Sequence, residues 1–158
     1  MDGVAFSNTL RFPRGAGASL TRTGGTNDGI QNTLIGSNAG STLTTGYSNV
    51  FVGRHAGSGC VGGFQNVIIG RVTGVGNAFL HYNVAIGAAT SLVAGSNQIL
   101  IGYGLTSRGE GTITIGGNGN LAGTYIAGIR QYASPASRVV TVADDNRLGS
   151  RPIEDIVG

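Results

Sequence analysis

One short phrase occurs six times along this chain, and it restricts the possible folds more than any other feature of the sequence. Each copy consists of an Asn or another polar residue, three β-prone residues and a closing Gly. The copies occupy 32–36, 49–53, 66–70, 83–87, 98–102 and 112–116, so their closing glycines are 17, 17, 17, 15 and 14 residues apart. A period of this size is typical of proteins built from stacked supersecondary units.

The three central residues of each phrase predict a short β-strand, because they are too few for a helix and too apolar for a loop. The segments between phrases are rich in Gly, Ser, Thr and Asn, as at 37–46. Such segments favour turns, since Gly reaches positive φ without steric cost. We therefore expect an all-β fold, a parallel β-roll or β-helix solenoid in which one strand and its turns form one coil.

Both faces of the predicted strands are apolar. Alternate side chains of a strand point to opposite faces. One face carries the middle residues Leu34, Phe51, Ile68, Ala85, Leu100 and Thr114, and the other carries mostly Val and Ile. A thin coil has one interior, and an uncovered apolar stripe favours aggregation. Copies of the same chain are therefore expected to cover the second stripe around a symmetry axis.

The residue that opens the first four phrases is an asparagine, at Asn32, Asn49, Asn66 and Asn83. Equivalent residues of stacked coils lie above one another, so these amides are expected to form a structural, hydrogen-bonded ladder. Two residues earlier stands an apolar or aromatic row, Ile30, Tyr47, Phe64 and His81. We interpret His81 as a stacked member of this row rather than as a ligand or a base.

Charge is distributed unevenly along the chain. All ten basic residues are Arg, against seven carboxylates, for a net charge of +3. No Asp or Glu lies between Gly29 and Arg108, yet Arg54 and Arg71 follow the closing glycines of adjacent coils, with His55 beside them. Like charges stacked about 5 Å apart cost free energy unless an anion lies between them. These three residues therefore form a hypothetical anion site for a surface phosphate or an acidic sugar; two solvated arginines that point apart are the alternative.

The coils lack the residues that catalysis or metal binding commonly requires. Glycoside hydrolysis uses two carboxyl groups, calcium-binding rolls place Asp in their turns, and 117–123 lacks the Lys and Ser/Thr of a phosphate loop. Cys60 is the only cysteine and has no partner within the chain for a disulfide. No apolar run reaches 18 residues. We expect no enzymatic activity, no cofactor, no metal, no nucleic-acid partner and no membrane insertion.

The phrase Asn-Val-Ala-Ile-Gly at 83–87 and its relatives resemble the head repeats of trimeric autotransporter adhesins. In that family three chains pack along a common axis as left-handed parallel β-rolls. The longer repeats, such as 32–40 followed by 44–49, are similar to those of phage tail fibres and related bacterial fibre proteins. The resemblance implies a homotrimer in a virion tail fibre or an extracellular, cell-surface fibre. It leaves phage or bacterial origin open.

The C-terminal part departs from the repeat. Strands are predicted at 124–130 and 138–143, and a Leu-Gly pair follows at 148–149. In the fibre proteins that this tail resembles, such a pair precedes an endosialidase-type intramolecular chaperone domain, whose start 150–156 resembles. Ile153 stands where that family has a Lys, so self-cleavage at Ser150 is not expected. The expected division is an N-terminal β segment with a Gly-rich connector (1–29), a repeat β-roll (30–120), a terminal β region (121–149) and a remnant of the chaperone start (150–158).

Together these features favour a non-enzymatic, homotrimeric fibre shaft or tip that attaches to a cell-surface receptor or glycan. Tyr82, Tyr103 and Arg108 stand on loops and are further candidate contacts. A purely structural spacer is the main alternative. A polysaccharide-degrading tailspike would depend on Glu110, and an ice-binding solenoid would need rows of Thr that this sequence does not place at matching positions.

Overall fold

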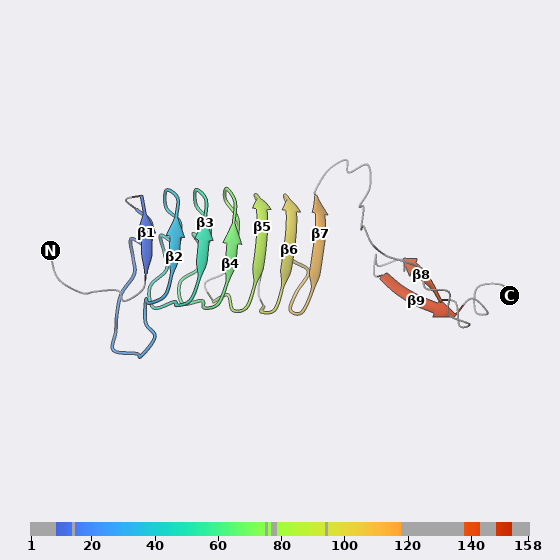
Figure 1. The fold of residues 1–158 in the computed structure, drawn as a ribbon, viewed down its shortest axis with the longest axis horizontal. Coiled ribbons are helices and arrows are strands. Elements are labelled where there is room, and N and C mark those ends of the chain that lie inside the picture. Colours follow the sequence, from blue (N-terminus) through green and yellow to red (C-terminus); the bar gives the residue numbers. More distant parts are fainter. Residues whose placement is uncertain are drawn as a thin grey trace. The chain divides into compact units, whose positions relative to one another are not determined.

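The computed structural model describes residues 9–13, 15–74, 76, 79–93 and 95–117, together with the backbone of 138–142 and 148–152. The chain divides into two units, Met1–Thr124 and Tyr125–Gly158. Every regular element in the described residues is a β-strand (Figure 1). The prediction of an all-β fold is confirmed.

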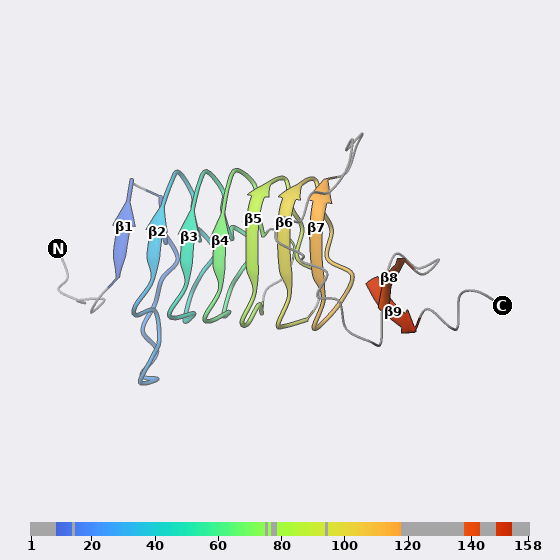
Figure 2. The same cartoon turned by 45° about the vertical axis from the view of Figure 1, so that its right-hand side comes forward.

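The first unit is a parallel β-solenoid. Its strands are β1 (Leu10–Phe12), β2 (Thr33–Ile35), β3 (Val50–Val52), β4 (Val67–Ile69), β5 (Val84–Ala88), β6 (Ile99–Tyr103) and β7 (Ile113–Gly117). They form one seven-stranded sheet in chain order, with each strand parallel to the next. Figures 1 and 2 show the strands side by side, joined by return segments. β2 to β7 begin at the six predicted phrases, so that prediction is confirmed.

Strand β1 adds a coil upstream of the six phrases. It lies within the expected N-terminal β segment and joins the same sheet, where Leu10 pairs with Thr33 and Phe12 with Ile35. The loop at 23–28 is closed by one carboxylate, since the Asp28 Oδ2 accepts hydrogen bonds from the Thr23 hydroxyl (2.6 Å) and the Gly25 amide (2.9 Å). These hydrogen bonds hold the pKa of Asp28 below its usual value.

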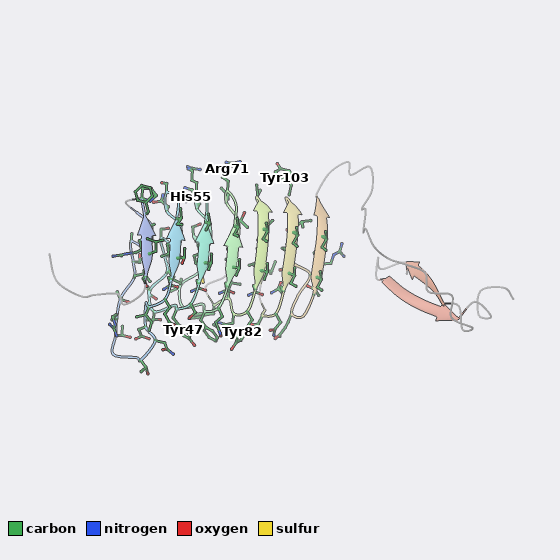
Figure 3. All side chains as sticks on the ribbon, in the orientation of Figure 1. Tyr47, His55, Arg71, Tyr82 and Tyr103 are labelled. Atoms are coloured by element: carbon green, nitrogen blue, oxygen red, sulfur yellow. The ribbon has the colours of Figure 1, made fainter. Side chains whose placement is uncertain are left out.

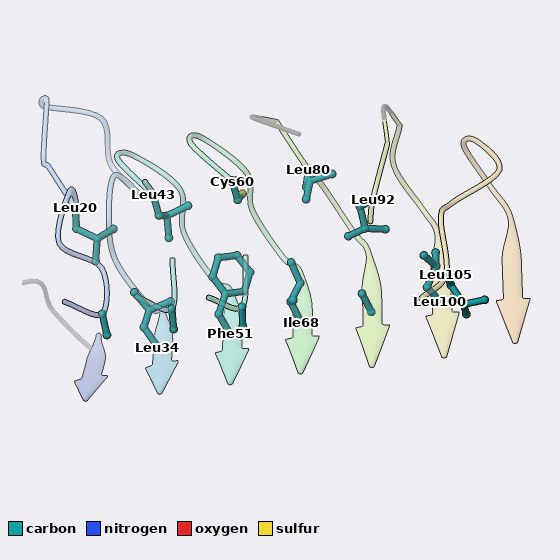
Figure 4. Packing of buried hydrophobic residues seen from close by; sticks show 14 residues of the cluster. Leu20, Leu34, Leu43, Phe51, Cys60, Ile68, Leu80, Leu92, Leu100 and Leu105 are labelled. Atoms are coloured by element: carbon teal, nitrogen blue, oxygen red, sulfur yellow. The ribbon is translucent and has the colours of Figure 1, made fainter. Parts of the chain in front are cut away.

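The interior of the solenoid is filled from two sides. The inward-facing residues of β2 to β6 are fully buried, namely Leu34, Phe51, Ile68, Ala85 and Leu100. Opposite them, return segments contribute Leu43, Cys60, Leu80, Leu92 and Leu105 (Figure 4). Burying a side chain of this size stabilises a fold by about 1.5–3 kcal/mol. Burial also raises the pKa of the Cys60 thiol.

A glycine closes each phrase because no other residue fits there. Gly53 and Gly70 both have φ of +130°, which L side chains rarely adopt. A Cβ on Gly53 would collide with the backbone carbonyl of Gly70 in the next coil. The glycine row therefore lets the coils approach to strand-pairing distance along β2 to β6.

The predicted asparagine ladder is present. The Asn49 Nδ2 donates to the Asn32 Oδ1 at 3.0 Å, the Asn66 Nδ2 to the Asn49 Oδ1 at 2.9 Å, and the Asn83 Nδ2 to the Asn66 Oδ1 at 3.1 Å. At Gln98 only the backbone amide continues the ladder, donating to the Asn83 Oδ1. Its buried side-chain amide has no hydrogen-bond partner. The ladder thus depends on the short Asn side chain.

The aromatic row before the ladder is also stacked as predicted. The ring centroids of Tyr47 and Phe64 lie 4.9 Å apart, and the angle between the two ring planes is 5°. For Phe64 and His81 the centroid distance is 4.0 Å and the interplanar angle is 27°. His81 also forms a parallel β-bridge with Phe64. Its ring is therefore a member of the stack.

The second unit contains an antiparallel pair, β8 (Arg138–Val142) and β9 (Leu148–Pro152). β8 confirms the strand predicted at 138–143. In β9, Ser150 pairs with Val140, so the segment assigned to a chaperone start begins within a strand. The strand predicted at 124–130 lies outside the described residues.

Candidate functional site

The residues that directly follow the strand glycines form one continuous row along an edge of the sheet. We call this set the turn row; its members are Ser37, Arg54, Arg71, Ala88, Tyr103 and Gly117. Backbone hydrogen bonds tie neighbouring coils together along it. They run from His55 N to Ser37 O, from Val72 N to Arg54 O, from Ala89 N to Arg71 O and from Gly104 N to Ala88 O, at 2.9–3.0 Å. Successive members are therefore held one coil apart, about 4.8 Å.

Arg54 and Arg71 are adjacent in the turn row and both are exposed. The ends of strands β3 and β4 bring them together, since Val52 pairs with Ile69 just before the glycines. Neither guanidinium makes a hydrogen bond or an ion pair with any described residue. On either side the row continues with small side chains, Ser37 and Ala88. The two exposed arginines thus stand on adjacent coils, with small side chains at the next positions of the row.

His55 lies beside Arg54 on the same edge (Figure 3). Its backbone is left-handed, with φ of +59°, and its amide is held by the Ser37 carbonyl at 2.9 Å. The corresponding residues Asn38, Val72 and Ala89 are also left-handed. This turn geometry is shared by successive coils, so the position of the His55 backbone follows from the repeat itself.

Tyr103 belongs to the same row as the arginines. It pairs with Ala88 in the register of β5 and β6, and 64% of its side chain is exposed. It lies two coils beyond Arg71, about 10 Å away along the sheet, and Figure 3 shows it on the same edge. From the sequence we treated Tyr103 as a separate loop contact. Tyr103 directly follows the strand glycine Gly102, just as Arg54 follows Gly53. This shared position in the sequence indicates that both residues belong to one row.

Two other predicted contacts lie elsewhere. Tyr82 is on the opposite edge of the solenoid (Figure 3), where its half-exposed ring packs edge-on against Phe64 at 5.3 Å. Arg108 is exposed in the return segment between β6 and β7 and lies outside the turn row. The structure therefore brings together Arg54, His55, Arg71 and Tyr103, and it leaves Tyr82 and Arg108 apart from them.

The outward face of the solenoid sheet forms a second notable surface. Its side chains are apolar in every strand except at Thr33. Exposure is 36% at Ile69 and 39% at Ile101, and it rises to 68% at Ile113. Seven strands spaced about 4.8 Å apart make this stripe roughly 30 Å long. An exposed apolar surface of this extent marks an interaction site more often than plain surface.

Acidic and metal-ligating side chains are sparse in the described residues. These residues hold no group of three His, Cys, Asp or Glu side chains placed to bind a metal ion. Asp28 and Glu110 are the carboxylates among them, and neither belongs to the turn row. In this part of the chain no helix has the length and hydropathy needed to cross a membrane.

Comparison with protein-family models, with curated proteins and with solved structures finds no match to this chain. Two surfaces of the structure are therefore the candidates for function. They are the apolar outward face of the sheet and the basic turn row at its edge.

Proposed function

We propose that the chain is a non-enzymatic segment of a homotrimeric fibre that attaches to a cell surface. The observation that carries the proposal is the outward face of the seven strands, which is apolar, uncharged and exposed or half-exposed along its whole length. A rod with such a stripe needs a cover to stay soluble.

A second copy of the same chain suits this face better than an unrelated partner. The stripe repeats with the spacing of the coils, so an identical, aligned stripe presents the same spacing at every level. The face has no charges with which to orient a different partner. Closed assemblies of identical chains are also the commonest oligomers. The number three rests on the resemblance to trimeric fibre repeats, since the face itself requires only that copies meet.

Attachment is the proposed task because the turn row lies on the edge of the strands rather than on their outward face. In a fibre whose outward faces pack together, this edge with Arg54, Arg71 and Tyr103 stays accessible. Three copies would then present three equivalent rows, and weak contacts would add up through avidity. A purely structural spacer is the second candidate, favoured by the regularity of the coils. A glycan array probed with the purified protein separates the two, because a spacer binds nothing on it.

Analytical ultracentrifugation of the whole chain tests the assembly. The expected mass is that of three copies. Ile69→Arg together with Ile86→Arg places charges on the outward face and is expected to give single copies or aggregates. Gln65→Arg is the matched control, since Gln65 is exposed in a turn off the outward face; it should leave the mass unchanged. A soluble, folded single copy of the unaltered chain would overturn the proposal.

A further inference from the structure

The strongest unexplained feature of the described residues is the pair of unpartnered arginines in the turn row. Arg54 and Arg71 stand on adjacent coils, and the sequence holds no carboxylate from residue 29 to residue 109 that could neutralise them. Two like charges held side by side repel each other. A fold that gains nothing from this placement would do better with Ser or Ala, the residues that flank the pair at Ser37 and Ala88.

The chemistry of the pair identifies the complementary group. A guanidinium presents a planar fork of N–H donors that matches the two oxygens of a carboxylate or the oxygens of a phosphate. Arg54 and Arg71 stand on adjacent coils whose backbones lie about 4.8 Å apart, so both long side chains can reach the same oxyanion. Both side chains are exposed, so each contact contributes little by itself. Useful affinity therefore requires a ligand that makes further contacts.

Tyr103 supplies the further contact, so a bound ligand would extend along the turn row from the arginines to this ring. It lies in the same row about 10 Å from Arg71, and the only side chain between them is the methyl group of Ala88. A free phosphate or acetate held by the arginines would not reach the tyrosine ring. A chain of sugars would span this distance and could lay the apolar face of one ring on the phenol.

We propose that the turn row binds an acidic oligosaccharide, with an oxyanion of one sugar held between Arg54 and Arg71 and a neighbouring sugar packed on Tyr103. The inference rests on the proposed attachment function and names the class of ligand for it. His55 follows Arg54 on the same edge of the sheet and offers further hydrogen-bonding groups there.

The test is an array of oligosaccharides in three classes, carboxylated, phosphorylated and neutral, probed with the intact protein at low and physiological salt. The expected result is retention of one or both acidic classes and no retention of the neutral class. The two acidic arms decide whether the oxyanion is a carboxylate or a phosphate. Inorganic phosphate should compete only weakly, because it cannot contact Tyr103. Equal competition by duplex DNA would show unspecific anion binding and would overturn the inference.

Variants separate the site from the net charge of the protein. Arg54→Ala with Arg71→Ala should weaken binding at least about tenfold and flatten its salt dependence, and Tyr103→Ala should weaken it severalfold. Arg108→Ala is the matched control, since it removes an exposed arginine outside the turn row. The inference fails if the double variant binds like the unaltered protein, or if no acidic oligosaccharide is retained.

The assembly is measured on the same samples by ultracentrifugation. A trimer that retains no acidic oligosaccharide would overturn this inference while leaving the fibre proposal intact. A single folded copy would overturn the fibre proposal itself. The substituted side chains are all exposed, so circular dichroism should show an unchanged β-sheet spectrum for each variant.

Discussion

Ile68 and Ile69 are neighbours in strand β4 and have the same side chain, yet their surroundings differ completely. Ile68 is fully buried inside the coil, whereas 36% of Ile69 is exposed on the outward face. The same contrast holds between Leu100 and Ile101, of which only the first is buried. The inner and outer faces of this sheet therefore differ in what covers them, and hardly in how apolar they are.

What covers the inner face is the return segment of the same chain, and the fit is close. The Phe51 ring lies against two glycines of the return segments: a Cβ on Gly57 would come within 2.6 Å of its ring, and one on Gly40 within 3.0 Å. The outward face has β-branched residues and no such complementary partner among the described residues. The inner face is thus completed within one chain, and the outer face is the surface on which we propose that another copy packs.

The largest expected effect comes from emptying the inner face. Phe51→Ala should lower the free energy of unfolding by about 3–5 kcal/mol, because it removes buried area and leaves a cavity that the return segments cannot fill. Val52→Ala on the outward face is the matched control. In single copies released by Ile69→Arg with Ile86→Arg it should cost less than about 1 kcal/mol. Urea unfolding measures both, and equal losses in single copies would contradict the contrast between the faces.

A smaller loss is expected from the ladder that borders the inner face. Asn66→Ala removes the Oδ1 that accepts from the Asn83 amide and the Asn83 Nδ2, and also the donor to the Leu80 carbonyl. Leaving these buried groups unpaired should lower the unfolding free energy by about 2–3 kcal/mol.

Gln98→Met provides the comparison for the ladder in the same unfolding experiment. The Gln98 amide is buried without a partner, so replacing it with an apolar side chain of similar length should cost little or should stabilise the protein. A loss as large as that of Asn66→Ala would show that the Gln98 amide is paired in solution.

The positions of the strands and of the ladder were predictable, because the opening Asn and the closing Gly fix the phase of each coil. The identity of the inner face was not, since Ile68 and Ile69 look alike in sequence. It is decided by the return segments, whose core residues do not keep the period: 17 residues separate Leu43 from Cys60, but 20 separate Cys60 from Leu80. In the candidate site the arginine pair was predictable from its spacing. Tyr103 could be assigned to the same row only by aligning the coils on their closing glycines, because Tyr103 directly follows Gly102.

Cysteine labelling compares the faces with a smaller change to the core than Phe51→Ala makes. Cys60 is buried, and its pKa is raised by burial, so the folded protein should react with iodoacetamide far more slowly than the unfolded chain. Ile69→Cys in a Cys60→Ala background reports on the outward face. In the proposed fibre this introduced thiol should be protected, and adding Ile86→Arg to separate the copies should expose it. Fast labelling of the introduced thiol in the undiluted protein would show that nothing covers this face.

The smallest expected effect is a response to acid, and it should occur away from both faces. Neither face of the seven strands carries a carboxylate, whereas Asp28 closes the 23–28 loop through Thr23 and Gly25. Because the folded pKa of Asp28 lies below its unfolded value of 3.8, its contribution is present above that value and is lost as pH falls through the folded pKa. In an NMR titration the amide of Gly25 should therefore shift at low pH while those of Val67 and Ile69 stay unchanged. Shifts at Ile69 in step with Gly25 would mean that the outward face depends on the charge of this loop, which its uncharged composition argues against.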